Sequence, residues 1–243
     1  MTRMNCFIST ITITKDNNTG LFRTLNSLVN LVTKPMEVII VNGNPQDDEI
    51  LIMIDRFKSE LTINFVNESD EGIYDAMNKG KNLAKANLIH YLNAGDEVTS
   101  DIYKNINQPC LLPVKIIDKS GGSSWFDKPK FFGFAYCHQG LIFSKDHEPY
   151  DLNFKVSADF NTIVKSYPGG LKKLNISRNG FVKYFLDGFS SQHSFLGNYE
   201  MIMILWNQFS YPKAFLVSTF IILKFCFPRK FRRLLMNFFF KRL

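Results

Sequence analysis

The sequence predicts an α/β fold built around a mostly parallel β-sheet. Between residues 7 and 97, segments with a strand pattern alternate with segments of helical periodicity. Short polar loops separate these segments, and the 243 residues are enough for one large α/β domain. Strands joined by helical crossovers in a β-α-β order run parallel, because such crossovers are right-handed.

Each of four predicted strands is apolar and ends at a polar loop. The first, residues 7–14, is rich in β-branched residues and alternates apolar with polar side chains, a pattern that favours a strand. The second and fourth, 37–41 and 88–92, are short apolar runs typical of strands buried on both faces, and the third is 63–66. The helices between them are predicted by leucines from Leu21 to Leu31, by residues 50–57, and by the apolar face of residues 73–84.

The second half of the chain is less regular. Residues 111–117 are compatible with a strand, 131–143 are rich in aromatic residues, and 158–167 have helical spacing. In a parallel sheet, ligands bind beyond the carboxyl ends of the strands. We therefore expect a ligand site among the loops 15–20, 42–48, 67–72 and 93–97.

The charge is concentrated at the C-terminal end. The whole chain has 29 basic and 22 acidic residues, and residues 201–243 contain eight basic residues and no acid. Residues 1–200 are therefore nearly neutral, which argues against nucleic-acid binding by the body of the protein. The cysteines Cys6, Cys110, Cys137 and Cys226 lie far apart, so we expect reduced thiols rather than a zinc site or disulfides. The polar start of the chain lacks a signal-peptide pattern, which predicts a cytosolic location.

Two acidic segments follow predicted strands. The turn 93–97 places Asp96 and Glu97 directly after a strand, where a carboxylate can hold Mg²⁺ or Mn²⁺ against a diphosphate. The segment 68–80 carries Asp70, Asp75, Asn78 and Lys79 around the start of a helix. Each segment has a plainer interpretation: an acidic turn for the first, and a capped surface helix with a solvated charged face for the second.

Together, these segments resemble the family-two glycosyltransferases of the GT-A fold. The resemblance lies in Thr12 and Thr14, in residues 41–44, in Asp70-Glu-Gly-Ile-Tyr-Asp-Ala-Met-Asn-Lys-Gly80, and in Leu92-Asn-Ala-Gly-Asp96. It covers residues 5–165 and is most similar to the branch that builds colanic acid and other bacterial surface polysaccharides. It implies an inverting, metal-dependent transfer of a sugar from a nucleotide-sugar donor, UDP-linked by expectation, to a polyprenyl-diphosphate-linked sugar acceptor.

The resemblance also implies roles for individual residues. Asp96 matches the metal ligand for Mn²⁺ or Mg²⁺, whereas Gly95 stands where the family has another acid, and Glu97 is a possible helper. Asn42 stands where the family has an aspartate that contacts the base. The full set of expected donor-binding residues is Thr12, Thr14, Asn42, Asp70, Asp75, Lys79 and Asp96.

The expected acceptor residues lie in the second half. Asp159, in Ser157-Ala-Asp-Phe160, matches the catalytic base, and His138-Gln139 matches a pair expected to line the acceptor cleft. By themselves, Asp159 would be interpreted as a helix-capping residue and His138 as a core histidine. These roles therefore depend on the resemblance.

The C-terminal segment has a different character. Residues 214–227 are apolar but too short to span a bilayer, and 229–243 have a basic face and an aromatic face. We expect a membrane-association tail over 201–243, after a transferase domain over 1–200 with a donor half 1–100 and an acceptor half 101–200. Such a protein would lie on the inner face of the bacterial plasma membrane. The alternative for the tail is a helix docked on the body or on another subunit.

Two other functions stay open. Asn42 and Gly95 depart from the family pattern, which is compatible with a catalytically inactive, membrane-associated scaffold of the same fold. A sugar nucleotidyltransferase is the other possibility, but residues 15–20 lack the glycine-rich basic loop that such an enzyme would need. Retained donor hydrolysis or transfer would exclude the scaffold.

Overall fold

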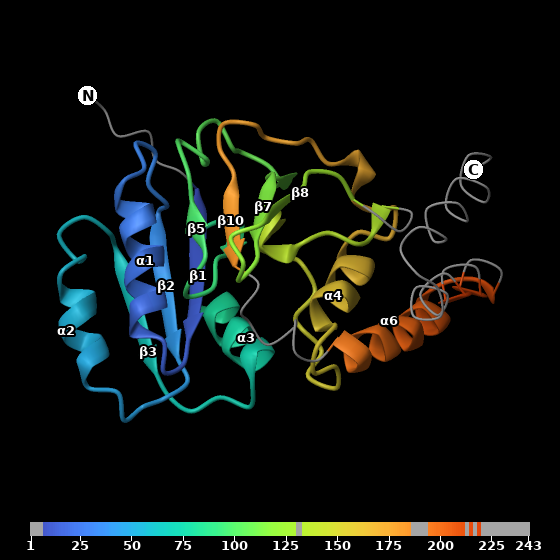
Figure 1. Cartoon of the computed structure of the whole chain (residues 1–243), viewed down its shortest axis with the longest axis horizontal. Helices are drawn as coiled ribbons and strands as arrows, with labels where there is room; N and C mark the ends of the chain where they lie inside the picture. Colours follow the sequence, from blue (N-terminus) through green and yellow to red (C-terminus); the bar gives the residue numbers. More distant parts are fainter. Residues whose placement is uncertain (1–6, 130–132, 186–193, 212–213, 216–217, 220–243) are drawn as a thin grey trace.

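The computed structural model describes residues 7–129, 133–185, 194–211, 214–215 and 218–219. A six-stranded sheet of order β3-β2-β1-β4-β9-β6 forms its centre (Figure 1). The first four strands are parallel, and β9 runs antiparallel to both its neighbours. This confirms the predicted α/β fold with a mostly parallel sheet. The strands are β1 (Ile8–Thr14), β2 (Glu37–Asn42), β3 (Ile63–Asn67), β4 (Leu88–Tyr91), β6 (Cys110–Leu111) and β9 (Leu141–Ser144).

Helices cover both faces of this sheet, and for this reason every residue of β1, β2 and β4 is buried. On one face, α1 (Asn18–Val29) and α2 (Glu49–Asp55) pack on a core that includes Ile8 and Ile40. On the other face, α3 (Ile73–Leu83) and α4 (Ala158–Ser166) pack on a core that includes Ile11 and Ile39. The alternation of strand side chains between the two cores follows from the two-residue period of a strand.

A second, four-stranded sheet of order β5-β10-β7-β8 lies beside the first. Its strands are β5 (Glu97–Val98), β7 (Val114–Ile117), β8 (Ser123–Phe126) and β10 (Val182–Phe185). The segment 111–117, read from the sequence as one strand, is divided between the two sheets, as β6 and β7. Pro113 lies at the division, where its missing N–H cannot contribute to a ladder.

The remaining helix, α6 (Ser194–Gln208), packs on α4 through a third core that includes Phe160, Val164, Ile204 and Leu205. It runs through residue 200, the predicted boundary, and the division into domains 1–200 and 201–243 stays a prediction. No helix among the described residues is long and apolar enough to cross a membrane. The predicted amphipathic segment 229–243, Cys6 and Cys226 lie outside the described residues.

Candidate active site

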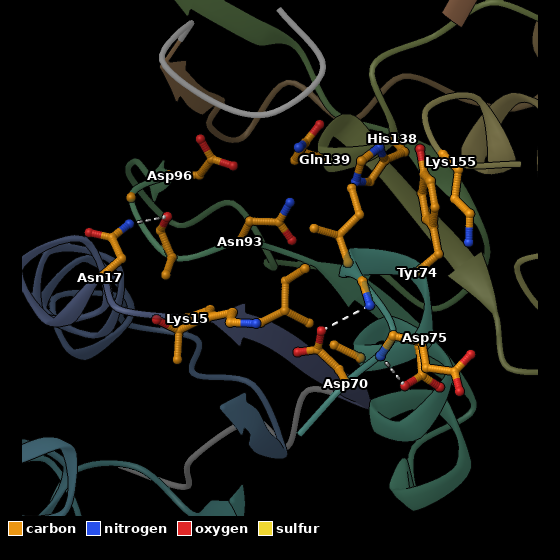
Figure 2. A pocket seen from close by; sticks show the side chains of 18 of the residues that line it. Lys15, Asn17, Asp70, Tyr74, Asp75, Asn93, Asp96, His138, Gln139 and Lys155 are labelled. Atoms are coloured by element: carbon orange, nitrogen blue, oxygen red, sulfur yellow. Dashed lines mark hydrogen bonds between the residues drawn. The ribbon is translucent and has the colours of Figure 1, made fainter. Parts of the chain in front are cut away.

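A pocket of about 540 Å³ opens at the carboxyl ends of β1 and β4. The start of α3 and the short 3₁₀ helix η2 (His138–Gly140) complete its walls. Figure 2 shows Asp96 and Asn17 on one side and His138, Tyr74 and Lys155 on the other. Three of the four loops expected to hold a ligand contribute to the lining, and loop 42–48 does not. Its polar residues instead line a shallower depression with Asp16 and Asn18.

Asp96 is held at the pocket wall by the turn that follows β4. Asp96 is only 5% exposed, and its Oδ1 accepts a hydrogen bond from the Phe185 amide at 3.3 Å. Thr24 of α1 fixes the turn, because its hydroxyl donates to the Asp96 carbonyl at 2.7 Å and accepts from the Gly95 amide at 3.0 Å. Gly95 has a φ of 110°, where a side chain would be strained. This conformation gives a physical reason for glycine where an acid was expected.

The donor set at this turn fits a divalent cation that is shared with a substrate. Glu97 lies outside the pocket lining, and its carboxylate pairs with Lys183 Nζ at 2.8 Å. Among the described residues, no cluster of three or more histidine, cysteine or acidic side chains could hold a metal ion. Mg²⁺ is commonly bound by one or two carboxylates together with substrate phosphates, so the single carboxylate of Asp96 is sufficient for that mode.

Asp70 and Asp75 line the pocket at the entrance to α3. Asp70 Oδ1 accepts from the Gly72 amide at 2.9 Å, and Asp75 Oδ2 accepts from the Glu71 amide at 3.0 Å. Burial alone would raise the pKa of Asp75, but the Glu71 amide and the Lys79 ammonium outweigh it and lower that pKa. Lys79 itself does not line the pocket. Its Nζ donates to the Ser69 carbonyl at 2.7 Å and lies 3.1 Å from Asp75 Oδ2, so it stabilises the loop.

The other predicted donor residues are divided between the pocket and the core. Thr14 lines the pocket, whereas Thr12 and Asn42 are fully buried outside the lining. The Asn42 amide donates to the Asn44 carbonyl at 2.7 Å and to Asn67 Oδ1 at 2.9 Å, so it joins the loops after β2 and β3.

His138 and Gln139 line the pocket from η2, and Asp159 lies behind His138 in the first turn of α4. His138 Nδ1 is 3.1 Å from Asp159 Oδ2. Gln139 Oε1 accepts from the Cys137 thiol at 2.9 Å. The structure therefore brings Asp159 to the pocket through His138, and Asp159 is not itself a lining residue.

Several lining residues were not predicted from the sequence, among them Lys15, Asn17, Tyr74, Asn93, Lys155, Tyr184 and Phe185. The Tyr74 hydroxyl donates to the Val156 carbonyl at 2.5 Å and lies 3.4 Å from Asp159 Oδ1. Burial, reinforced by the nearby Asp159 charge, raises the pKa of Tyr74 well above its usual value. Lys15, Asn17 and Asn93 lie in loops that the strand pattern had already marked. Tyr184 and Phe185 come from β10, which carries no local signal of a site.

Residues 9–129 match the family model described as Glycosyl transferase family 2. The chain therefore carries a glycosyl transferase family 2 domain. The match includes the turn with Asp96 and the loop with Asp70, and it ends before η2 and α4.

Mycobacterial glycosyltransferases are similar in sequence to this chain. The PGL/p-HBAD biosynthesis glycosyltransferases of Mycobacterium tuberculosis and Mycobacterium bovis are 26% identical to this chain over 161 aligned residues. That alignment covers 59% of this chain and 62% of the relatives, so the chain spans less than two thirds of their length.

Solved structures show the same fold at low identity. The 1–349 fragment of S. aureus TarS in complex with UDP has a TM-score of 0.63 and 14% identity, over 92% of this chain and 73% of that fragment. GalNAc-T7 with UDP, GalNAc and Mn²⁺ has a TM-score of 0.58 and 15% identity, over 82% of this chain and 47% of that one. The architecture is thus that of GT-A glycosyltransferases.

Proposed function

We propose that this protein transfers a sugar from a nucleotide-sugar donor to a hydroxyl of an acceptor, with inversion at the anomeric carbon. One observation carries the proposal: the pocket at the carboxyl ends of β1 and β4 contains buried polar atoms that lack a partner among the described residues. They are Thr14 Oγ1, Asn93 Oδ1 and His138 Nε2. A buried polar atom without a hydrogen bond costs about 1–3 kcal/mol, so a polyhydroxylated ligand that satisfies these atoms is favoured.

The donor is proposed to be a UDP-sugar. TarS was solved with UDP and with UDP-GlcNAc, and GalNAc-T7 with UDP and Mn²⁺. In this chain, the proposed donor contacts are Thr14, Asp70, Asp75 and Asp96, with Asn42 and Lys79 supporting the loops that carry them. Thr12 is buried within β1, outside the pocket lining, and is not among the proposed contacts. Mn²⁺ or Mg²⁺, held by Asp96, would neutralise charge on the departing diphosphate. Lys15, which lines the same pocket, adds a positive charge below Asn17 and toward Asp70 in Figure 2.

The acceptor is proposed to enter on the side of His138 and Gln139. An inverting displacement needs a group that takes the proton of the attacking hydroxyl, and such a base accelerates transfer by about 10²- to 10⁴-fold. The Asp159 carboxylate, together with His138 beside it, is the base that we assign. Asp159 lies in the first turn of α4, with its Oδ2 3.1 Å from His138 Nδ1.

The acceptor class that we propose is a polyprenyl-diphosphate-linked sugar in bacterial surface polysaccharide synthesis. Its lipid stays in the bilayer, so the enzyme must work at the membrane surface. Residues 201–243 carry eight basic residues and no acid, and each adds about 1 kcal/mol of attraction near an anionic surface. We therefore propose a peripheral location at the inner face of the plasma membrane.

Calorimetric titration tests the donor assignment. We expect the protein to bind one of UDP, GDP or dTDP, UDP first, and to bind it more tightly with Mn²⁺. Asp96→Asn should remove the effect of Mn²⁺, because the variant loses the charge that holds the ion. Glu97→Gln is the matched control, since Glu97 is the neighbouring acid but pairs with Lys183. A folded protein that binds no nucleotide would contradict the transferase and favour the inactive scaffold.

Sedimentation with lipid vesicles tests the membrane assignment. The full chain should sediment with phosphatidylglycerol vesicles and much less with phosphatidylcholine vesicles. Replacing Arg229, Lys230, Arg232 and Arg233 by glutamine should weaken binding by about 10²-fold or more, since about 1 kcal/mol is lost with each charge. Replacement of Lys34, Lys58, Lys85 and Lys104 by glutamine removes the same charge from the main body and is the control. Equal binding of both variants would overturn the assignment.

A further inference from the structure

The outward side of α6 is apolar and aromatic. Four of its large side chains are 42–79% exposed and lie four, four and three residues apart: Phe195, Tyr199, Met203 and Trp206. This spacing places them on one face of the helix, called the outer face below. The ring of Tyr211 packs against Trp206 at a centroid distance of 5.9 Å and extends the patch. Figure 1 shows α6 beside α4, at the end of the molecule away from α2.

The outer face contains no charged side chain. Glu200 is the only charged residue of α6, and it is 5% exposed. Its carboxylate accepts hydrogen bonds from the amides of Lys155, Val156 and Ser157 at 2.8–2.9 Å. The opposite side of α6 is already buried on α4 in the third core. An exposed, uncharged apolar patch on a packed helix is typical of a surface that contacts another protein or a membrane.

The composition of the chain favours a lipid surface as the partner. Trp and Tyr are enriched where a bilayer meets water, because their rings are apolar and carry one polar group. Residues 212–243, a few positions after α6, contain eight basic residues and no acid. A second copy of the chain would bring the same excess of positive charge, whereas anionic lipid headgroups attract it. The aromatic outer face and the charge of the segment after it therefore point to the same partner.

We propose that the outer face of α6 binds the headgroup region of an anionic membrane, as a contact separate from the basic residues of 212–243. The inference deepens the proposed membrane location and rests on it. Basic residues attract a protein to the surface, whereas inserted apolar side chains fix its depth and orientation. Glu200 joins α6 to the segment that contains Lys155, a pocket-lining residue. A membrane-bound α6 therefore holds the acceptor side of the pocket at a fixed position relative to the bilayer.

Tryptophan fluorescence tests the contact directly, because the chain has two tryptophans, Trp125 on β8 and Trp206 on α6. In Trp125→Phe, we expect phosphatidylglycerol vesicles to shift the Trp206 emission to shorter wavelength, and lipids brominated in their acyl chains to quench it. Trp206→Phe is the matched control: Trp125, which is 53% exposed, should show neither effect. A shift of the Trp206 emission with protein concentration in the absence of lipid would show that a second copy covers the face, and would overturn the proposal.

Vesicle sedimentation of a substituted chain measures how much the outer face contributes. Replacing its four helical members, Phe195, Tyr199, Met203 and Trp206, by glutamine should weaken binding by about 10²-fold or more. The loss should persist at about 0.5 M NaCl, because salt screens the attraction of basic residues but not an apolar contact. The control replaces four exposed apolar residues of the main body by glutamine: Val32, Leu51, Ile52 and Leu83. Both variants should unfold at the urea concentration of the unmodified chain, since none of these side chains belongs to a core.

The outcomes distinguish this inference from the proposed function. Equal binding of the two glutamine variants, or Trp206 emission that does not respond to vesicles that bind the chain, would refute the contact through α6 and leave the basic residues as the membrane contact. Failure of the unmodified chain to bind vesicles would refute the membrane location itself. Neither result bears on the sugar transfer, which the nucleotide titration tests without lipid.

Discussion

Among single residues, Gly43 decides where the side chain of Asp70 can lie. A Cβ atom at Gly43 would lie 1.9 Å from Asp70 Oδ2, so any side chain there must displace the carboxylate. The Gly43 amide also donates to the Thr14 carbonyl at 2.9 Å, which fixes the backbone of the loop. The position of Asp70 therefore depends on the absence of a side chain one loop away.

Gly43→Ala is expected to weaken nucleotide binding about as much as Asp70→Ala does. A loss of one charged hydrogen-bonding group corresponds to about 1.5–3 kcal/mol, or roughly ten- to hundredfold in the dissociation constant. Since both changes remove the same interaction, the double variant should bind no more weakly than either single variant. Calorimetric titration with UDP measures this, and Gly169→Ala, whose added Cβ would meet only Lys173 at 3.7 Å, is the control. Additive losses in the double variant would show that Gly43 acts on something other than Asp70.

The residues of the site could be predicted from the sequence only in part. The strand pattern marked the loops that form the pocket, and Asp70 and Asp96 line it from those loops. Thr14 and Asp75, expected from the family resemblance, line it from the end of β1 and the start of α3. The strand pattern did not distinguish the pocket-lining residues from Asn42, whose side-chain amide joins two loops. Polar side chains in a loop either face a ligand or close the loop. Only the geometry distinguishes the two uses.

At the scale of elements, the start of α4 depends on α6. The carboxylate of Glu200, on α6, accepts hydrogen bonds from the amides of Lys155, Val156 and Ser157 at 2.8–2.9 Å. Ser157 also donates its hydroxyl to the Gly197 carbonyl at 2.8 Å. These bonds hold the segment that places Asp159 two residues later, so α6 supports the acceptor side of the pocket.

Glu200→Gln should therefore damage both stability and turnover. A neutral amide keeps one acceptor oxygen for the three amides, and hydrogen bonds to a charged group contribute about 1.5–3 kcal/mol. We expect the free energy of unfolding in urea to fall by about 1–3 kcal/mol. Turnover should fall as well, while UDP affinity stays unchanged, because the donor side is built from β1, β4 and α3. Glu148→Gln, an exposed acid, should change none of these quantities. Weakened UDP binding in Glu200→Gln would contradict this division.

The elements also differ in how far the sequence predicts them. The strands β1 to β4 are predictable because each is a local apolar run between polar loops. The second sheet is not, since β10 pairs with β5 and β7 from the far end of the chain. Residues 201–208 of α6 were assigned to the expected tail 201–243 from their apolar character and the absence of acids. Ile204 and Leu205 are buried, but Phe195 is 79% exposed and Trp206 is 42% exposed. The apolar residues of α6 therefore do not lie on one face of the helix.

For the whole molecule, two buried histidines link folding stability to pH. Burial lowers the pKa of His90 and that of His147 to about 4, although hydrogen bonds to the carbonyls of Gln139 and Ser144 partly oppose the shift. In the unfolded chain both would titrate near 6.5. The folded protein therefore keeps both rings neutral across a range in which the unfolded chain takes up protons.

Since the folded pKa values lie below the unfolded ones, this stabilisation is complete above pH 6.5 and is lost as the pH falls toward 4. Each histidine should lower the free energy of unfolding by up to about 1.4 kcal/mol per pH unit in that window. Urea unfolding measured at half-unit steps from pH 7.5 to 5 would give the slope. His147→Gln should be less stable at pH 7.5 yet show about half the slope, because one of the two titrating rings is gone. An unchanged slope in that variant would mean that other groups govern the acid sensitivity of the fold.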